Sequence, residues 1–259
     1  MRHAAFAACL ALAWTANAFA QSPAAAPPSP DFFTRYDFRL SANALAVEDQ
    51  SFSWDAHFGG ALDLVDYVVG RTSILVDYEA VLGDQFRAFD PNQSYYTLEA
   101  SSSFRSSVAE IAGVFHHVSR HLSDRAKQEA IAWNVFGVRV LRRVAAGATT
   151  VDARAEAGSV LQRSQVDYAW TAGADVMVRR QVRPRVGVFA HGCGELIGVD
   201  TSIGNRETQK GGRLEGGVRF DGRVGAIELF AGFERRIDAD PFKRVPVRWG
   251  IAGFRLLGK

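Results

Sequence analysis

The stretch from Val108 to Val140, VAEIAGVFHHVSRHLSDRAKQEAIAWNVFGVRV, holds two runs of alternating side chains separated by a polar segment. In the first run Glu110 shares a face with His116 and with small and apolar residues, and the opposite face begins at Ala109 and continues with Ile111. In the second run Arg139 alternates with valines. Because successive side chains of a strand point to opposite faces, this stretch predicts a β-hairpin in which only one face carries charge.

The same alternation extends over most of the chain, and helical periodicity is hard to find. We therefore predict an all-β protein, an antiparallel transmembrane β-barrel of about twelve strands, most of them near the 9–11 residues that cross a bilayer. The expected strands are 35–44, 52–58, 72–80, 94–104, 108–119, 132–142, 150–161, 166–179, 185–197, 211–220, 224–235 and 246–256.

Alternation alone is also compatible with a soluble β-sandwich or a lipocalin, in which the apolar face lies inside. The connections favour the membrane barrel, because outer-membrane barrels have short turns at one end and long loops at the other. Short turns are expected at 66–71, 105–107, 181–184 and 221–223, and long polar loops at 83–93, 120–130, 199–210 and 236–245.

The N-terminus reads as an export signal. Residues 1–20 combine a positive start, the short apolar run Ala4–Trp14 and a small-x-small site that ends at Ala20. Residues 21–31 form a Pro/Ala-rich tether that we expect to be disordered, and residues 32–259 form the barrel. We expect cleavage after Ala20 and location in the outer membrane of a Gram-negative cell envelope.

The composition argues against several other classes of protein. The mature part keeps only Cys193, so no internal disulfide can form. The net charge of +2 is far below the basic excess of a nucleic-acid-binding protein. No later run reaches the roughly 20 apolar residues of a transmembrane helix.

The hairpin carries the candidate catalytic residues. Charged side chains are costly against lipid, so Glu110 and Arg139 should face the lumen, which places His117, Ser119 and Asn134 on the lipid-facing side. A symmetric hairpin sets His117 opposite Asn134, within side-chain reach. Ser119 would then be the nucleophile, His117 the general base and Asn134 the residue that orients the imidazole.

At this point the chain resembles a known family. His117-Val118-Ser119, a polar loop and then Trp133-Asn134 look like the pattern of outer-membrane phospholipase A, and lipid A 3-O-deacylases also carry a His-x-Ser pair on a barrel exterior. The resemblance implies a twelve-stranded barrel that hydrolyses acyl esters of outer-leaflet lipid with the same three residues. It also makes calcium a candidate cofactor and a homodimer a candidate assembly.

The chain departs from that family after the serine. Arg120-His121 stands where the family has Asn-Gly, and only Ser123 matches the serines that bind calcium there. The run from His117 to Asp124 also resembles uncharacterised outer-membrane barrels with the signature His-x-Ser-x-His-Leu-Gly-Asp. No chemistry follows from that second likeness.

Non-catalytic interpretations stay open. The three polar residues could be ordinary rim residues of a non-enzymatic barrel, either a narrow pore or a structural protein. The lumen of such a barrel would carry the charged residues Asp152, Arg154, Glu156, Asp175 and Arg179. At most three of His116, His117, His121 and Asp124 can converge, so we expect no metal site there.

Three further expectations concern the surface of the barrel. Basic loop residues would meet lipopolysaccharide phosphates or form a solvated rim: Arg206, Lys210, Arg235, Arg236, Lys243 and Arg244. Aromatic residues would form the two interfacial girdles: Trp54, Tyr67, Tyr95, Tyr96, Trp133, Tyr168, Trp170 and Trp249. The barrel assembly machinery commonly reads a C-terminal Phe or Trp, whereas this chain continues past Phe254 to Lys259, which is an imperfect assembly signal.

Overall fold

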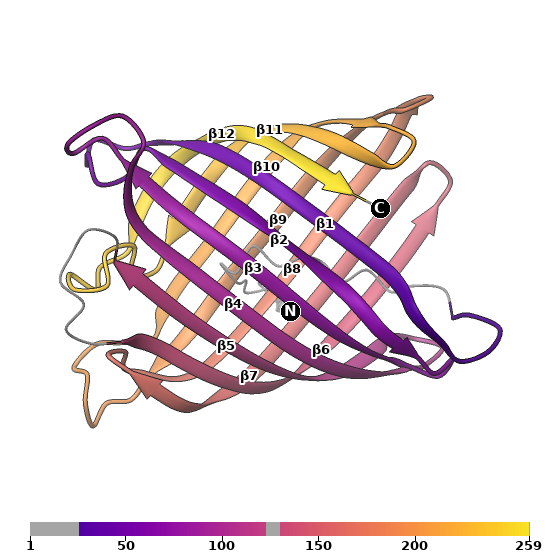
Figure 1. The fold of residues 1–259 in the computed structure, drawn as a ribbon, viewed down its shortest axis with the longest axis horizontal. Helices are drawn as coiled ribbons and strands as arrows, with labels where there is room; N and C mark the ends of the chain where they lie inside the picture. Colours follow the sequence, from indigo (N-terminus) through magenta and orange to yellow (C-terminus); the bar gives the residue numbers. More distant parts are fainter. Residues whose placement is uncertain (1–25, 123–129, 259) are drawn as a thin grey trace, which may run out of the picture.

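The computed structural model describes residues 26–122 and 130–258, which form a closed antiparallel barrel (Figure 1). No helix in these two segments is long and apolar enough to cross a membrane. The barrel confirms the predicted fold. Its strands are β1 (Asp31–Ala46), β2 (Trp54–Asp66), β3 (Arg71–Gly83), β4 (Asp90–Arg105), β5 (Glu110–Leu122), β6 (Ile131–Ala146), β7 (Thr149–Ser164), β8 (Tyr168–Arg183), β9 (Val186–Val199), β10 (Gln209–Asp221), β11 (Gly225–Arg236) and β12 (Val247–Gly258).

Each strand pairs with its neighbours in sequence, and β1 closes the ring by pairing with β12 from Phe38–Gly258 to Ala46–Gly250. Closure leaves no unpaired strand edge, which would otherwise expose backbone hydrogen-bonding groups to lipid. The hairpin β5–β6 has the expected register, with His117 opposite Asn134.

The two ends of the barrel differ in their connections. At one end, where β1 begins and β12 ends, the turns are short: 67–70, 106–109, 147–148, 184–185 and 222–224. At the other end, on the left in Figure 1, the connections are longer apart from 165–167: 47–53, 84–89, 123–130, 200–208 and 237–246. The predicted asymmetry is confirmed, and we call the second end the loop end.

The outer surface of the wall is apolar and the lumen is charged. Exposed outward residues include Phe58, Val76, Leu98, Phe115, Phe136, Val138, Leu214 and Leu229. Buried lumen residues include Asp152, Arg154, Glu156 and Asp175, as the alternation predicted. Arg179 also reaches the lumen acids, with its Nη1 atom 3.2 Å from Oδ2 of Asp152. This reversal of the usual soluble pattern fits an apolar solvent outside the barrel.

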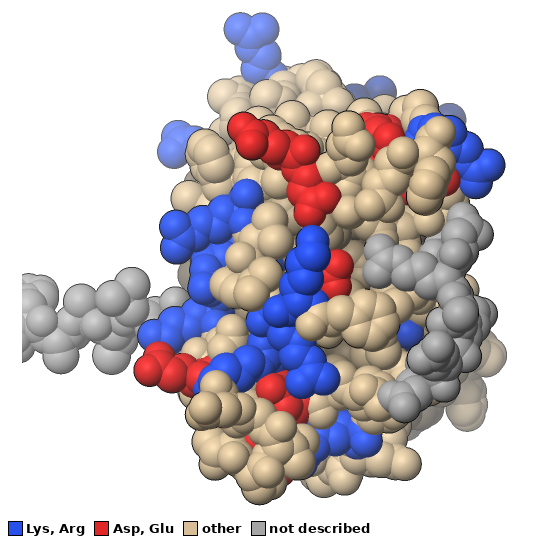
Figure 2. All heavy atoms as spheres, turned by 90° about the vertical axis from the view of Figure 1, so that its left-hand side faces the viewer, with Lys and Arg blue, Asp and Glu red and all other residues tan. Residues whose placement is uncertain are grey.

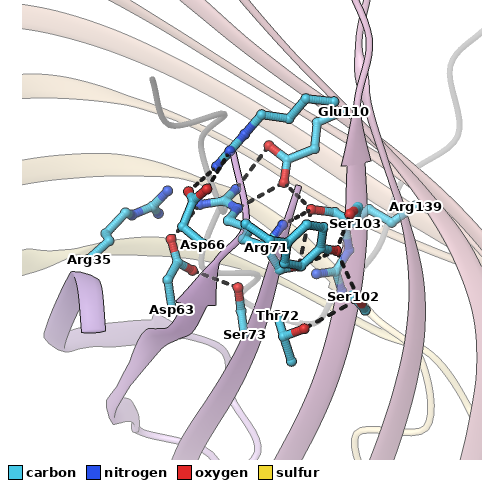
Figure 3. Close-up of polar contacts among 12 residues, drawn as sticks. Arg35, Asp63, Asp66, Arg71, Thr72, Ser73, Ser102, Ser103, Glu110 and Arg139 are labelled. Atoms are coloured by element: carbon cyan, nitrogen blue, oxygen red, sulfur yellow. Dashed lines mark hydrogen bonds and ion pairs between the residues drawn. The ribbon is translucent and has the colours of Figure 1, made fainter. Parts of the chain in front are cut away.

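Ion pairs link neighbouring strands on the lumen wall at several levels, because a buried charge without a partner is very costly. Near the short turns, the guanidinium of Arg71 lies 2.8 Å from both Asp63 and Glu110 (Figure 3). Deeper in the barrel, Arg139 contacts Glu99 and Glu156, each at 2.6 Å.

The connection 237–246, here called the mouth loop, crosses the lumen at the loop end. It leaves β11, yet its backbone accepts hydrogen bonds from β4 and β5, on the opposite side of the ring. Arg120 donates to the carbonyl of Asp238 at 2.7 Å, and Gln93 donates to that of Ala239 at 2.7 Å. The side chain of Asp238 accepts from Tyr168 at 2.8 Å and from Arg206 at 2.7 Å. These contacts hold the mouth loop inside the barrel.

The aromatic residues only partly match the expected girdles. Trp249 is 3% exposed and belongs to an apolar cluster in the lumen, and Tyr95, Trp133 and Tyr168 line a lumen cavity of about 110 Å³. The girdle prediction is wrong for these four residues. Parity places Tyr95, Trp133 and Trp249 on the charged face, and an irregularity in the pairing of β8 between Tyr168 and Trp170 turns Tyr168 to the same face. They pack under the mouth loop, and the ring of Trp249 lies 5.2 Å from the Arg236 guanidinium.

Candidate functional site

The outer face of β5 carries the candidate residues at the loop end. His117 and Ser119 are half-buried and His121 is exposed, whereas His116 and Arg120 are buried in the lumen. His116 lies 2.5 Å from Glu156, and the register of β5 fixes which neighbours face out. The structure therefore places His117 and Ser119 on the apolar outer face of the barrel with Phe115.

The imidazole of His117 is held by the neighbouring strand. Its Nδ1 lies 2.7 Å from Oδ1 of Asn134, and the Nδ2 of Asn134 donates to Gln162 at 3.1 Å. Since the amide nitrogen is donating to Gln162, its oxygen accepts from His117, so Nδ1 carries the proton. Nε2 of His117 is then the basic nitrogen. This is the tautomer that a general base needs.

The hydroxyl of Ser119 is paired with a different histidine. Its Oγ lies 2.8 Å from Nε2 of His121, two residues further along the same face of β5. The His121 ring meets the edge of Tyr96 on β4, with ring centroids 5.1 Å apart. Among the described residues, the structure thus joins His117 to Asn134 and Ser119 to His121 in two separate hydrogen bonds.

Ser119 therefore stands between two imidazoles, at positions −2 and +2 on one strand face. The Ser119 hydroxyl rotates about a single bond between staggered positions, and in this structure it is turned to His121. His121 was not assigned a catalytic role from the sequence. The signal that identifies it is the full spacing His-x-Ser-x-His, which places all three side chains on one side of a strand.

The surroundings of the site are apolar and aromatic. Phe115 is 41% exposed and Phe136 is 56% exposed, next to His117 and Asn134 respectively along their strands. On the other side Tyr78 and Tyr96 pack together with ring centroids 5.0 Å apart. A lipid acyl chain can contact such a surface, because no charged side chain interrupts it between these residues on β5 and β6.

Calcium prefers carboxylate, carbonyl and water oxygens. Among the described residues, Ser119 and His121 contact each other and His121 contacts the Tyr96 ring, so the Ser119 hydroxyl is the one oxygen that this group offers. Ser123 and Asp124, which the sequence offered as ligands, lie outside the described residues.

The basic residues of the loop end are mostly engaged with acids. Figure 2 shows Lys and Arg gathered across the middle of this end, with acidic side chains beside them. Arg236 is a correction to the predicted rim, because it is buried in the lumen and contacts Asp55 and Glu79 at 2.7 Å each. It follows Glu234 and lies on the inward parity of β11. Lys210 and Lys243 are exposed.

Two loop acids have lowered pKa values. Hydrogen bonds from Ser202, together with Arg163, hold the pKa of Asp200 at about 2. Burial raises the pKa of Asp167, but the hydrogen bonds and charge of Arg206 outweigh it and leave that pKa below its ordinary value. Both acids are ionised at neutral pH and fix the loops that surround the mouth.

Comparison with solved structures finds the same barrel fold in outer-membrane proteins. It is similar to the calcium-bound dimer of outer membrane phospholipase from Salmonella typhi, with 10% identity, coverage of 90% of this chain and 93% of that chain, and a TM-score of 0.51. It is also similar to outer membrane phospholipase A from Escherichia coli, with 8% identity, coverage of 86% and 92%, and a TM-score of 0.52. At such identities the likeness is one of fold. No protein-family profile and no curated protein sequence matches the chain.

Proposed function

We propose that this outer-membrane barrel hydrolyses acyl esters of outer-leaflet lipid. Ser119 is the nucleophile, His117 the general base and Asn134 the residue that orients the base. The observation that carries the proposal is the 2.7 Å contact between Nδ1 of His117 and Oδ1 of Asn134 on the lipid-facing wall. It fixes the tautomer that leaves Nε2 of His117 free to accept a proton.

In the proposed reaction Ser119 Oγ attacks the ester carbonyl carbon and passes its proton to Nε2 of His117. The protonated imidazole then gives this proton to the leaving alcohol, which leaves an acyl group on Ser119. Water attacks the acyl-enzyme by the same route, releases the fatty acid and restores the serine. Asn134 accepts the Nδ1 hydrogen throughout and so stabilises the imidazolium.

The bond between Ser119 and His121 defines a resting arrangement within this proposal. Rotation of the Ser119 hydroxyl away from His121 brings it toward His117. His121 is then either a holder of the serine or the base itself, and the two roles predict different effects of its removal. No step depends on calcium, which we keep, with a homodimer, as an expectation from the family likeness.

The alternative is a non-enzymatic structural barrel. The mouth loop and the ion pairs on the lumen wall favour a structural role over an open pore. The contacts of Arg120 with the mouth loop join opposite walls of the ring. In that case His117, Ser119 and Asn134 are rim residues that hydrogen-bond headgroups. In either case we expect assembly by the barrel assembly machinery and contact with lipopolysaccharide through Lys210 and Lys243.

Hydrolysis of a phospholipid and of lipid A by the purified protein in mixed micelles tests the proposal, with and without calcium. We expect Ser119→Ala to abolish turnover, and His117→Ala to reduce it by about 10²–10⁴-fold, the usual contribution of a general base. Asn134→Ala should act in the same direction, and Ser159→Ala, an exposed serine on the outer face of β7, should have no effect.

The variant His121→Ala distinguishes whether His117 or His121 is the general base. If His121 only holds the serine, turnover falls little, whereas a fall as large as that of His117→Ala assigns the base to His121. Absence of turnover on both lipids by a correctly folded barrel, judged by its heat-modifiable migration, would overturn the hydrolase and leave the structural barrel. Cross-linking of active and inactive samples reports whether a homodimer accompanies activity.

A further inference from the structure

A second group of reactive side chains lies inside the barrel, on β8 and β9. Asp175, His191 and Cys193 all point into the lumen, and their ligand atoms lie within 4.8 Å of one another. Cys193 stands directly opposite Asp175 in the ladder, and His191 is two residues away on the same face. A thiol, an imidazole and a carboxylate therefore share one patch of the lumen wall.

The geometry points to a binding site for a divalent transition metal. We propose that Asp175, His191 and Cys193 coordinate a zinc-class ion, with a fourth position open to the lumen. Thiolate, imidazole and carboxylate are the three ligand types that zinc takes in proteins, and three such ligands with one open position is a recurring arrangement. Calcium and magnesium, which prefer oxygen ligands, do not suit this set.

The distances are close to those of a loaded site. Tetrahedral bonds of 2.0–2.3 Å separate neighbouring ligand atoms by about 3.4 Å. Nε2 of His191 already lies 2.6 Å from Oδ2 of Asp175, and the group as a whole spans at most 4.8 Å. Small rotations of the three side chains, which move their ligand atoms by about 1 Å, would complete the site without moving the strands.

Unsatisfied polar atoms support a missing partner. Among the described residues, Oδ1 of Asp175 is buried and has no hydrogen-bond partner. Asp175 is 4% exposed, so water does not readily substitute for one. A buried carboxylate oxygen normally has a partner, and a metal ion at this position would supply it. The other carboxylate near His191, Glu215, lies 3.3 Å from Nδ1 of His191 and is also bound by Arg213 at 2.7 Å and by Arg255, so it leaves Nε2 of His191 and the Asp175 carboxylate to the proposed ion.

A second group in the lumen has similar spacing between its ligand atoms but already contains a cation; it consists of Asp55, His57 and Glu79. The guanidinium of Arg236 lies 2.7 Å from both Asp55 and Glu79 and so occupies the cation position between them. This group contains no sulfur. It serves as the matched control for the site on β8 and β9.

Binding of the metal ion replaces protons on its ligands. The ion binds the thiolate of Cys193 and the unprotonated nitrogen of His191, and the protons that these groups carried are released to water. No electron transfer is involved. The affinity should therefore fall as the pH is lowered.

Cobalt titration of the full chain purified from membranes tests the proposal, because a thiolate–cobalt bond gives a near-ultraviolet charge-transfer band. We expect one Co²⁺ per chain, displaced by Zn²⁺, with a band that Cys193→Ser abolishes. Asp175→Asn should weaken binding by at least about tenfold, and Glu79→Gln should leave it unchanged. The same samples refolded with Co²⁺ present exclude a barrier to entry.

Heat-modifiable migration shows that each variant has folded, and His191→Gln provides a second ligand variant if Cys193→Ser does not fold. Failure of the folded wild-type chain to bind Co²⁺ under both loading conditions overturns the site. So does a band that persists in Cys193→Ser, or equal loss of binding in Glu79→Gln.

Discussion

Removal of Arg139 should destabilise the barrel through the two acids that it leaves behind. The Arg139 side chain is 0% exposed and contacts Glu99 and Glu156 at 2.6 Å each. Removing one member of a buried ion pair costs about 3–5 kcal/mol. Here Glu156 keeps Arg154 at 2.9 Å and His116 at 2.5 Å, and Glu99 keeps His116 at 3.2 Å.

Because both acids keep a partner, we expect Arg139→Leu to lie at the lower end of that range. The loss is then about 3 kcal/mol, a factor of about 150 in the unfolding equilibrium. Urea unfolding in lipid vesicles measures it, and an unchanged slope of free energy against urea shows that the folded state stays compact. The double variant Arg139→Leu, Glu99→Leu should recover part of the loss, because it removes one of the two acids whose charge Arg139 balanced.

Arg143→Leu is the matched control for this measurement. Arg143 contacts Asp152 at 2.6 Å, but its side chain is 42% exposed and Asp152 also contacts Arg179 at 3.2 Å. Exposed pairs contribute about 1 kcal/mol or less. If Arg139→Leu were no more destabilising than Arg143→Leu, the reasoning that lumen ion pairs hold this barrel would be refuted.

Two further predictions concern the mouth loop. Arg206→Ala removes contacts of 2.7 Å with both Asp167 and Asp238. Trypsin should therefore cut the mouth loop at Lys243 and Arg244 several times faster than in the wild type. Equal cleavage rates would show that these contacts do not hold the mouth loop. The lowered pKa of Asp167 means that its contribution is fully present above the ordinary pKa of 3.8 and is lost as pH falls through the lower folded value. Pepsin should therefore distinguish Arg206→Ala from the wild type at pH 4.5, with cleavage next to exposed Phe242 as the readout. The difference should shrink as the pH is lowered and Asp167 becomes protonated; a difference that does not shrink contradicts this assignment.

Local pattern was enough to predict the strands and their faces. Within a regular stretch of strand a side chain's face follows its parity, so the charges of Glu110 and Arg139 were sufficient to predict the outward direction of His117 and Asn134. The register of that hairpin followed as well, because its two strands are adjacent in sequence. The choice of a barrel depended on the loops, whose lengths are a local property too.

The sequence could not predict which side chains on distant strands pair inside the lumen, because these contacts depend on how the ring of strands closes. Arg236 on β11 reaches Asp55 on β2, and the same closure brings the mouth loop to Arg120. Alternation placed the aromatic residues near strand ends, but only closure showed that Trp133 and Tyr168 line a cavity. Side-chain rotation likewise decided that Ser119 contacts His121, since both histidines share its face.

The sequence by itself determined which residues face lipid and which face one another on neighbouring strands, since a strand repeats every two residues and a hairpin joins nearest neighbours. Only the tertiary structure decided which charges meet inside the lumen and that Asp175, His191 and Cys193 form a group distinct from the one occupied by Arg236. Those contacts depend on the curvature of the closed wall and on the positions that the terminal atoms of long side chains reach. Neither is determined by a local sequence pattern.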